Sequence, residues 1–78
     1  MLQRYGAWLP YGNHSWVVED YLYDNMIVDV CESSDEAYEL AFKLNQSHSN
    51  GTLPSDIFDL PLYIRKLKNS IREEKEER

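Results

Sequence analysis

Apolar and polar positions alternate along the first part of the chain. Residues 2–9 (LQRYGAWL), 15–23 (SWVVEDYLY) and 26–31 (MIVDVC) are rich in β-branched and aromatic residues, which predicts three strands. Pro10-Tyr11-Gly12-Asn13 has the composition of a turn, and Asp24-Asn25 are residue types that accept the left-handed conformation of a two-residue hairpin loop. The pattern therefore predicts an antiparallel meander, in which Gly6 marks a bulge or a close approach.

The Asp24-Asn25 loop sets the predicted register of the second hairpin. With this loop, the predicted cross-strand pairs are Tyr23–Met26, Tyr21–Val28, Glu19–Val30 and Asp20–Asp29. Met26, Val28 and Val30 then share one face, which we predict to be the core face, while Asp20 and Asp29 point to solvent. A change of one residue in the loop would re-pair the two strands.

Helical spacing begins after residue 32. Ser33 and Glu36 have the spacing of a capping box, in which each side chain accepts a hydrogen bond from the other residue's amide. Ala37, Leu40, Ala41 and Leu44 form one apolar stripe, so we predict a helix from about Ser34 to Gln46. Residues 45–52 (NQSHSNGT) are polar and rich in turn formers, which predicts that the chain loosens there.

A second helix is predicted after Asp59, with Asp59 as N-cap and Pro61 in its first turn. Its apolar stripe consists of Leu60, Ile64, Leu67 and Ile71. We expect this stripe to pack on the sheet or on the first helix; the alternative is a self-association seam between two copies. Residues 73–78 are all charged and predict a frayed helical tail.

Strands followed by helices, without alternation, indicate an α+β fold. We predict one compact domain over residues 1–72, in which a three-stranded antiparallel meander has one helix packed on a face and a C-terminal helix. With 42% hydrophobic residues and ten aromatic ones (two Trp, six Tyr and two Phe), the chain is too apolar for a disordered protein.

The single cysteine, Cys31, excludes an internal disulfide framework and indicates a reducing compartment. It lies in a predicted strand, where a buried and unreactive thiol is expected. The sequence shows neither a signal peptide nor an apolar run long enough to cross a membrane. We therefore expect a cytoplasmic protein without membrane contact.

Charge is unevenly distributed along the chain, whose net charge is −6. Residues 1–59 carry ten acids against two bases, Arg4 and Lys43, whereas residues 60–78 carry six bases against four acids. A surface of negative sign repels nucleic acid and attracts basic proteins. Direct binding of nucleic acid by the body of the domain is therefore not expected.

The acids are concentrated on the second hairpin and the start of the first helix. The predicted partner-binding residues are Glu19, Asp20, Tyr21, Asp24, Asp29, Glu32, Asp35, Glu36 and Glu39. Such a surface suits the basic groove of a nucleic-acid-handling enzyme, which a phage-type or mobile-element-type inhibitor blocks by imitating phosphates. The alternative is a solvated strand face followed by ordinary acids at a helix N-terminus. The basic side of the last helix (Arg65, Lys66, Lys68 and Arg72) has the charge to pair with these acids, in the same copy or another.

The leading expectation is thus a non-enzymatic, cofactor-free acidic interaction module with a basic partner. Two other classes are weighed against it. One is a structural subunit or homodimer assembled through the C-terminal helix. The other is a small metal-dependent enzyme that uses Asp20 and Asp29 with Glu19 or His14. No spacing in the sequence is typical of a nucleotide, metal or nucleophile motif.

Overall fold

The computed structural model describes residues 3–10, 12, 14–56 and 58–76. Three strands, β1 (Tyr5–Trp8), β2 (Trp16–Asp20) and β3 (Met26–Cys31), form one antiparallel sheet in the order β1-β2-β3. A single 3₁₀ turn, η1 (Tyr21–Tyr23), separates β2 from β3. Two helices follow, α1 (Ser34–Asn50) and α2 (Leu60–Glu76). The predicted α+β fold with a three-stranded meander is confirmed.

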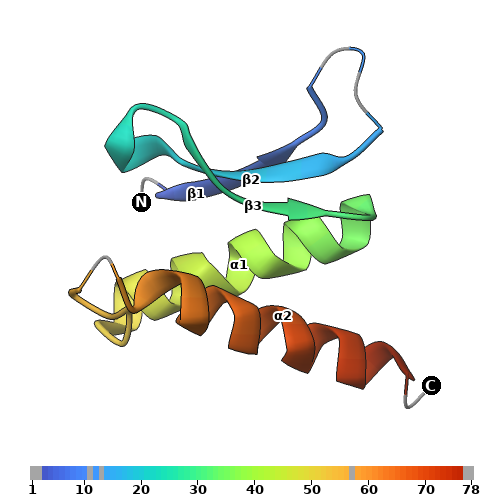
Figure 1. Cartoon of the computed structure of the whole chain (residues 1–78). Helices are drawn as coiled ribbons and strands as arrows, with labels where there is room; N and C mark the ends of the chain where they lie inside the picture. The colour runs from blue at the N-terminus through green and yellow to red at the C-terminus, as the bar shows by residue number, and fades with distance from the viewer. Residues whose placement is uncertain (1–2, 11, 13, 57, 77–78) are drawn as a thin grey trace.

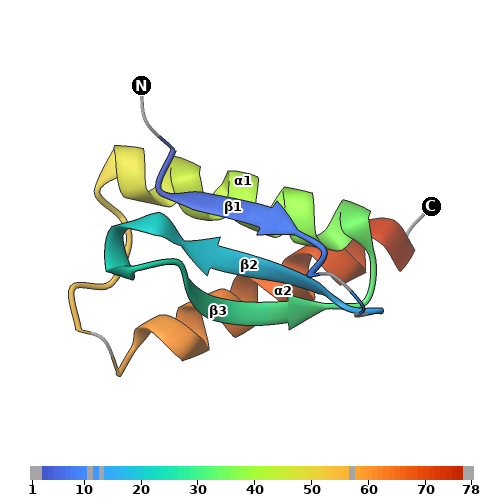
Figure 2. The ribbon, with the colours of Figure 1, turned by 90° about the horizontal axis from the view of Figure 1, so that it is seen from above.

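Both helices lie on the same side of the sheet. α1 runs directly beneath the strands and α2 packs beside α1 (Figure 1). Seen from above, the sheet lies in front of both helices, and neither helix covers the face turned toward the viewer (Figure 2). The two faces are called here the inner face, toward the helices, and the outer face, away from them.

The predicted register of the second hairpin is wrong. Val18 lies opposite Asp29, and Asp20 lies opposite Met26, so the predicted Asp20–Asp29 pair does not form. β2 ends at Asp20 because the carboxylate of this residue accepts a hydrogen bond from the Leu22 amide and turns the chain into η1. Asp24 and Asn25 then take the predicted left-handed conformation, with φ of 59° and 60°.

The predicted core face of this hairpin is also wrong. Val18 and Cys31 are buried against the helices, whereas Met26 and Val30 are about half exposed. A bulge shifts the register, because Val18 pairs with Asp29 while the next residue, Glu19, pairs with Ile27. Val28 is the extra residue at this bulge, and it alone of the three predicted core residues packs partly against the core. The core itself consists of Tyr5, Val18, Cys31, Ala37, Leu40, Ala41, Leu44, Ile64 and Ile71.

The first hairpin follows the predicted order. Gly6 is a point of close approach, as expected, because a Cβ atom there would collide with the side chain of Tyr21. In the predicted connecting turn, Gly12 has a positive φ of 82°. Tyr11 and Asn13 of the same turn lie outside the described residues.

The start of α1 is as predicted, but its end is not. The Ser33 hydroxyl accepts a hydrogen bond from the Glu36 amide, which confirms the N-cap. The Glu36 carboxylate completes the motif differently, since it accepts weakly from the Glu32 amide at 3.4 Å and pairs with Arg72. The helix continues past Gln46 to Asn50 and ends at Gly51 in the left-handed conformation.

Polar side chains in the last turns of α1 account for this extension. Asn45 accepts hydrogen bonds from the amides of Arg4 and Tyr5 and donates one to the Tyr5 carbonyl. Ser47 hydrogen-bonds to the hydroxyl of Tyr63 in α2. The polar composition of this stretch therefore reflects tertiary contacts of a helix, not a loop.

In α2 the apolar stripe packs within the fold. Ile64 and Ile71 are 4% and 0% exposed, and Leu60 and Leu67 pack partly buried against the same core. The expected packing is confirmed, and the buried pair is not available for the self-association seam. The helix continues through residues 73–76 of the charged tail; residues 77–78 lie outside the described part of the chain.

Candidate interaction surface

The fold divides the predicted acidic cluster. Three of its acids pair with bases of the same chain: Asp20 with Arg4 at 2.9 Å, Asp29 with Lys68 at 3.3 Å and Glu36 with Arg72 at 2.8 Å. The expectation that bases of the last helix pair with the hairpin acids is confirmed within one copy for Lys68 and Asp29. These three carboxylates are engaged inside the fold, so they do not belong to a continuous free acidic surface.

Asp20 is completely buried, and its carboxylate accepts three hydrogen bonds. Arg4 donates to both carboxylate oxygens through Nε and Nη2, and the Leu22 amide donates to one of them. The Arg4 guanidinium also lies 5.1 Å from the ring centroid of Tyr5 and 5.4 Å from that of Tyr23. The hydrogen bonds to Asp20 raise the pKa of Arg4. Asp20 therefore has no exposed surface in the folded chain, and its role in partner binding stays a prediction.

Asp29 and Lys68 satisfy the backbone at β3, an edge strand of the sheet. The Val30 amide donates to Asp29, and Lys68 Nζ donates to the Val30 carbonyl at 2.6 Å. At β1, the other edge strand, the Tyr5 amide and carbonyl bond to Asn45 in the same way. Each helix thus places one polar side chain on one edge strand, where unpaired backbone groups invite association with another chain.

The remaining predicted residues lie apart. Asp24 is exposed in the turn before β3, whereas Glu32, Asp35 and Glu39 follow the other end of this strand. A strand of six residues spans roughly 17 Å, so the two groups of acids do not share one patch. Tyr21 lies over Gly6 and is 48% exposed.

The predicted metal ligands are not brought together either. Asp20 and Asp29 each bind a base, and residues 3–10, 12, 14–56 and 58–76 contain no group of three His, Cys, Asp or Glu side chains able to hold a metal ion. Cys31 is buried, as expected, and burial raises the pKa of its thiol from 9.0 to about 11. This thiol is therefore protonated and unreactive at neutral pH.

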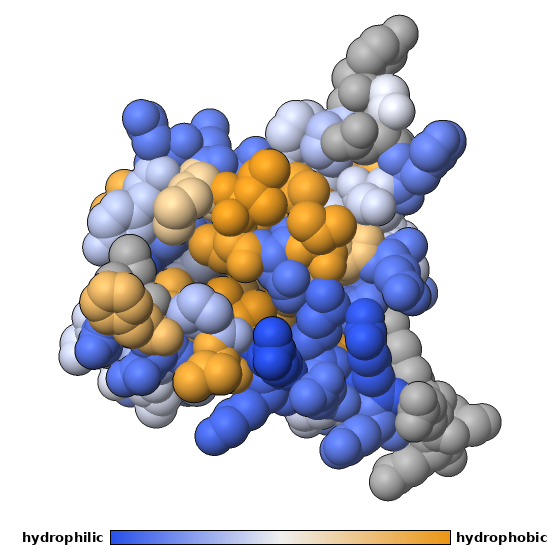
Figure 3. Space-filling model, viewed as in Figure 1, coloured by the Kyte–Doolittle hydropathy of each residue, from blue (hydrophilic) through white to orange (hydrophobic). Residues whose placement is uncertain are grey.

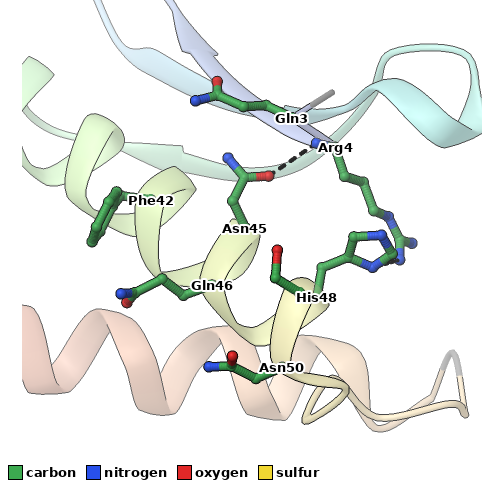
Figure 4. A pocket seen from close by; sticks show the side chains of 8 residues that line it. Gln3, Arg4, Phe42, Asn45, Gln46, His48 and Asn50 are labelled. Atoms are coloured by element: carbon green, nitrogen blue, oxygen red, sulfur yellow. Dashed lines mark hydrogen bonds between the residues drawn. The ribbon is translucent and has the colours of Figure 1, made fainter. Parts of the chain in front are cut away.

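A hollow of about 320 Å³ opens between the start of β1 and the last turns of α1. Gln3 and Arg4 line it from the strand side, and Asn45 and His48 from the helix (Figure 4). Its strongest polar groups already have structural partners, because Arg4 binds Asp20 and Asn45 binds the backbone of β1. His48 Nδ1 lies 3.4 Å from Arg4 Nη1. The positive charge of Arg4 in this hollow is thus already neutralised by Asp20.

The outer face of the sheet presents a different surface. Strand alternation from the buried residues Tyr5, Val18 and Cys31 places the opposite set of side chains on this face. These outer-face residues are Trp8, Val17, Glu19, Tyr21, Ile27 and Val30. Four of them are large apolar or aromatic residues that are 42–52% exposed, namely Trp8, Tyr21, Ile27 and Val30.

The apolar surface continues around the edge of β3. Figure 3, in the orientation of Figure 1, shows hydrophobic side chains gathered over this strand, above the charged surface of α2. Met26 is 44% exposed, and Ile27 and Val30 belong to both the edge and the outer face. An apolar area of this kind on a small domain is typical of an interaction site.

Glu19 lies in the middle of the outer face. Gly6 and Ile27 are its cross-strand neighbours, and the Tyr21 side chain stands over Gly6. The residue is only 9% exposed, yet its carboxylate has no hydrogen-bond or ion-pair partner among the residues that the structure describes. It differs in this from Asp20, Asp29 and Glu36, all of which are paired.

Sequence reasoning included Glu19 and Tyr21 in the partner-binding set but missed Trp8, Ile27 and Val30. The sequence predicts Val30 in the core because it is in phase with Met26 and Val28, and alternation does not say which face of the strand meets the helices. Ile27-Val28, two adjacent β-branched residues, is a signal that both faces of β3 carry apolar side chains.

Comparisons of the chain with protein-family models, with curated proteins and with solved structures gave no match. Within the described residues, neither helix is long and apolar enough to cross a membrane.

Proposed function

We propose that the protein is a non-enzymatic interaction module that binds a basic protein partner with the outer face of its sheet. The observation that carries this proposal is the uncovered outer face, on which Trp8, Tyr21, Ile27 and Val30 are 42–52% exposed. Trp and Tyr are among the residues that most often supply the binding free energy at the centre of protein interfaces, where neighbouring apolar side chains exclude water. Both helices lie on the opposite side, which leaves this face accessible.

The charge of the molecule supports a basic partner. The net charge is −6, and Asp24, Glu32 and Asp35 remain exposed around the two ends of β3. Charges at the rim of an interface accelerate association and orient the partner, while the apolar centre holds it. A nucleic-acid mimic instead needs a row of free carboxylates. Because Asp20, Asp29 and Glu36 are paired within the fold, the proposal is for a basic protein surface and does not extend to mimicry.

The cytoplasm is the proposed location. The one cysteine of the chain is buried and protonated, so it forms no disulfide within the chain. This agrees with a reducing compartment.

A capture experiment with matched variants tests the proposed function. The outer-face variant Ile27→Asp/Val30→Asp places two charges on the proposed contact surface. The control variant Phe42→Asp/Leu62→Asp changes two residues that are 61% and 59% exposed on α1 and α2. Circular dichroism first establishes that both variants are folded.

Immobilised wild-type protein is expected to retain basic proteins from a native lysate at about 50 mM salt and to release most of them at about 500 mM, where charge steering is screened. The control variant retains the same proteins and the outer-face variant loses them. Equal retention by both variants would show that the outer face is not the contact surface.

A further inference from the structure

We infer, on the basis of the interaction function proposed above, that Glu19 is the binding site for one lysine or arginine side chain of the partner, which inserts into the apolar outer face. Glu19 is 9% exposed and lies between its cross-strand neighbours Gly6 and Ile27. No described residue neutralises it. Among the described side chains only the Tyr5 hydroxyl is buried without a hydrogen-bond partner, so the Glu19 carboxylate is still reached from the surface, where a cation brought by a ligand can pair with it.

The surroundings of Glu19 select a cationic side chain. Tyr21 stands over Gly6, directly across from Glu19, and Trp8 occupies the next outer-face position of β1 beyond Gly6. Diagonal neighbours in a sheet lie roughly 7–8 Å apart, within reach of aromatic side chains. A carboxylate flanked by Trp and Tyr binds an ammonium or guanidinium group by charge and by cation–π contact together. A metal ion is not selected, because the described part of the chain places no second acid, His or Cys in a ligand group with Glu19.

A second copy of the chain does not satisfy Glu19 in a closed dimer. A two-fold axis through the outer face would bring two Glu19 carboxylates toward each other, and none of the outer-face residues is basic. The exposed bases Arg65 and Lys66 lie on α2, on the opposite side of the sheet. A contact between α2 of one copy and the outer face of another would be head-to-tail, which builds a ring or a filament and not a two-fold dimer. The inferred occupant is therefore a different protein whose apolar contact surface carries one basic residue.

Two blocked pentapeptides serve as probes: acetyl-Leu-Gly-Lys-Gly-Leu-amide and its counterpart with norleucine in place of lysine. The central side chains have the same four carbon atoms, and the lysine side chain adds the ammonium group. Binding is followed by NMR at millimolar peptide, from the indole N–H of Trp8 and the amides of Val17, Glu19 and Val30. We expect both peptides to shift these signals, with the lysine peptide binding about five- to ten-fold more tightly.

The variant Glu19→Gln keeps the side-chain shape and removes the charge. It is expected to abolish the preference for lysine while leaving the affinity for the norleucine peptide unchanged. The control Asp24→Asn removes one exposed acid from the neighbouring turn and is expected to keep the preference.

The outcomes separate this inference from the proposed function. If both peptides bind the wild-type outer face equally, Glu19 is not a cation-binding site, and the outer face remains a docking surface. If a preference for lysine survives in Glu19→Gln, the cation binds elsewhere and the inference is wrong. If neither peptide shifts the outer-face signals, the proposed function fails along with the inference. Concentration-dependent shifts of the same signals without peptide, lost in Glu19→Gln, would make a second copy the occupant and overturn the assigned partner.

Discussion

The two faces of the sheet treat their carboxylates in opposite ways. On the inner face, Asp20 is fully buried and receives two hydrogen bonds from Arg4, and Asp29 is paired with Lys68. On the outer face, Glu19 is nearly as buried as its neighbour Asp20 but has no partner among the described residues. Adjacent acids in the sequence thus differ in whether the fold supplies a cation.

The difference teaches that the chain supplies counter-charges to the carboxylates of the inner face and, among the described residues, none to that of the outer face. Each inner carboxylate has its counter-charge from Arg4, just before β1, or from α2, so folding alone accounts for its presence. The carboxylate of Glu19, which lies among the exposed Trp8, Tyr21 and Ile27, has no counter-charge among the residues that the structure describes. We take the missing counter-charge as the mark of an intermolecular contact, and the following changes test this contrast.

The largest effect is expected for Arg4→Met, which leaves Asp20 buried without its cation. Breaking a buried pair by removing one partner costs about 3–5 kcal/mol of the free energy of unfolding. Asp29 keeps about a quarter of its side chain exposed, so Lys68→Met is expected to cost only about 1 kcal/mol. Urea denaturation at pH 7 measures both losses.

The double variant Arg4→Met/Asp20→Leu supplies the control for Arg4→Met. It removes both charges and is expected to recover much of the lost stability, because an apolar pair leaves no unpaired charge in the interior. Equal losses for Arg4→Met and Lys68→Met would contradict the view that the inner face depends on the buried pair.

The Arg4–Asp20 pair also explains why the core face was predicted incorrectly. Alternation predicted the strands, and the Ser33 cap fixed the start of α1, because these signals are local. Which face of β2 is buried depends on a base 16 residues away that makes Asp20 compatible with burial. Local hydrophobicity favours the face with Met26, Val28 and Val30. It does not indicate that an acid such as Asp20 can be buried when a distant base pairs with it.

The same limit applies to the candidate site. Closeness in sequence suggested one acidic surface, yet β3 separates Asp24 from Glu32 and three other acids are engaged in ion pairs. The extension of α1 to Asn50 was missed because Asn45 and Ser47 are stabilised by β1 and α2 and not by their neighbours. The sequence places Glu19 and Tyr21 in the predicted partner-binding set, and the pair Ile27-Val28 is its one signal for a second apolar face of β3.

A second, smaller effect concerns the inner-face thiol of Cys31. Burial raises its pKa from 9.0 to about 11, so between these values the unfolded state alone releases the proton. The stabilisation is therefore complete below pH 9 and lost as the pH rises to about 11, with a decrease of order 2 kcal/mol. Burial also raises the pKa of Tyr5, which adds to the decrease above pH 10.

Urea denaturation from pH 8 to pH 11 measures this dependence, and Cys31→Val, which has no titrating group and a similar volume, is the control. The control is expected to lose less stability over the same range. A thiol reagent at pH 8 should modify the native protein far more slowly than the urea-unfolded protein. Rapid modification of the native protein would mean that Cys31 is accessible to the reagent, which would contradict its burial between the sheet and the helices.

The smallest effect is expected on the outer face, and it has the opposite sign. Glu19→Gln removes the charge of a residue that is 9% exposed and has no partner among the described residues, so the free energy of unfolding at pH 7 should stay constant or rise by up to about 1 kcal/mol. Asp35→Asn removes one negative charge from the first turn of α1, where the helix dipole favours it, and should cost about 0.3–1 kcal/mol. Both variants change the net charge equally, so a general charge effect cannot produce different signs. A clear loss of stability in Glu19→Gln would show that this carboxylate has a structural role in the isolated chain, and the contrast between the carboxylates of the two faces would then be lost.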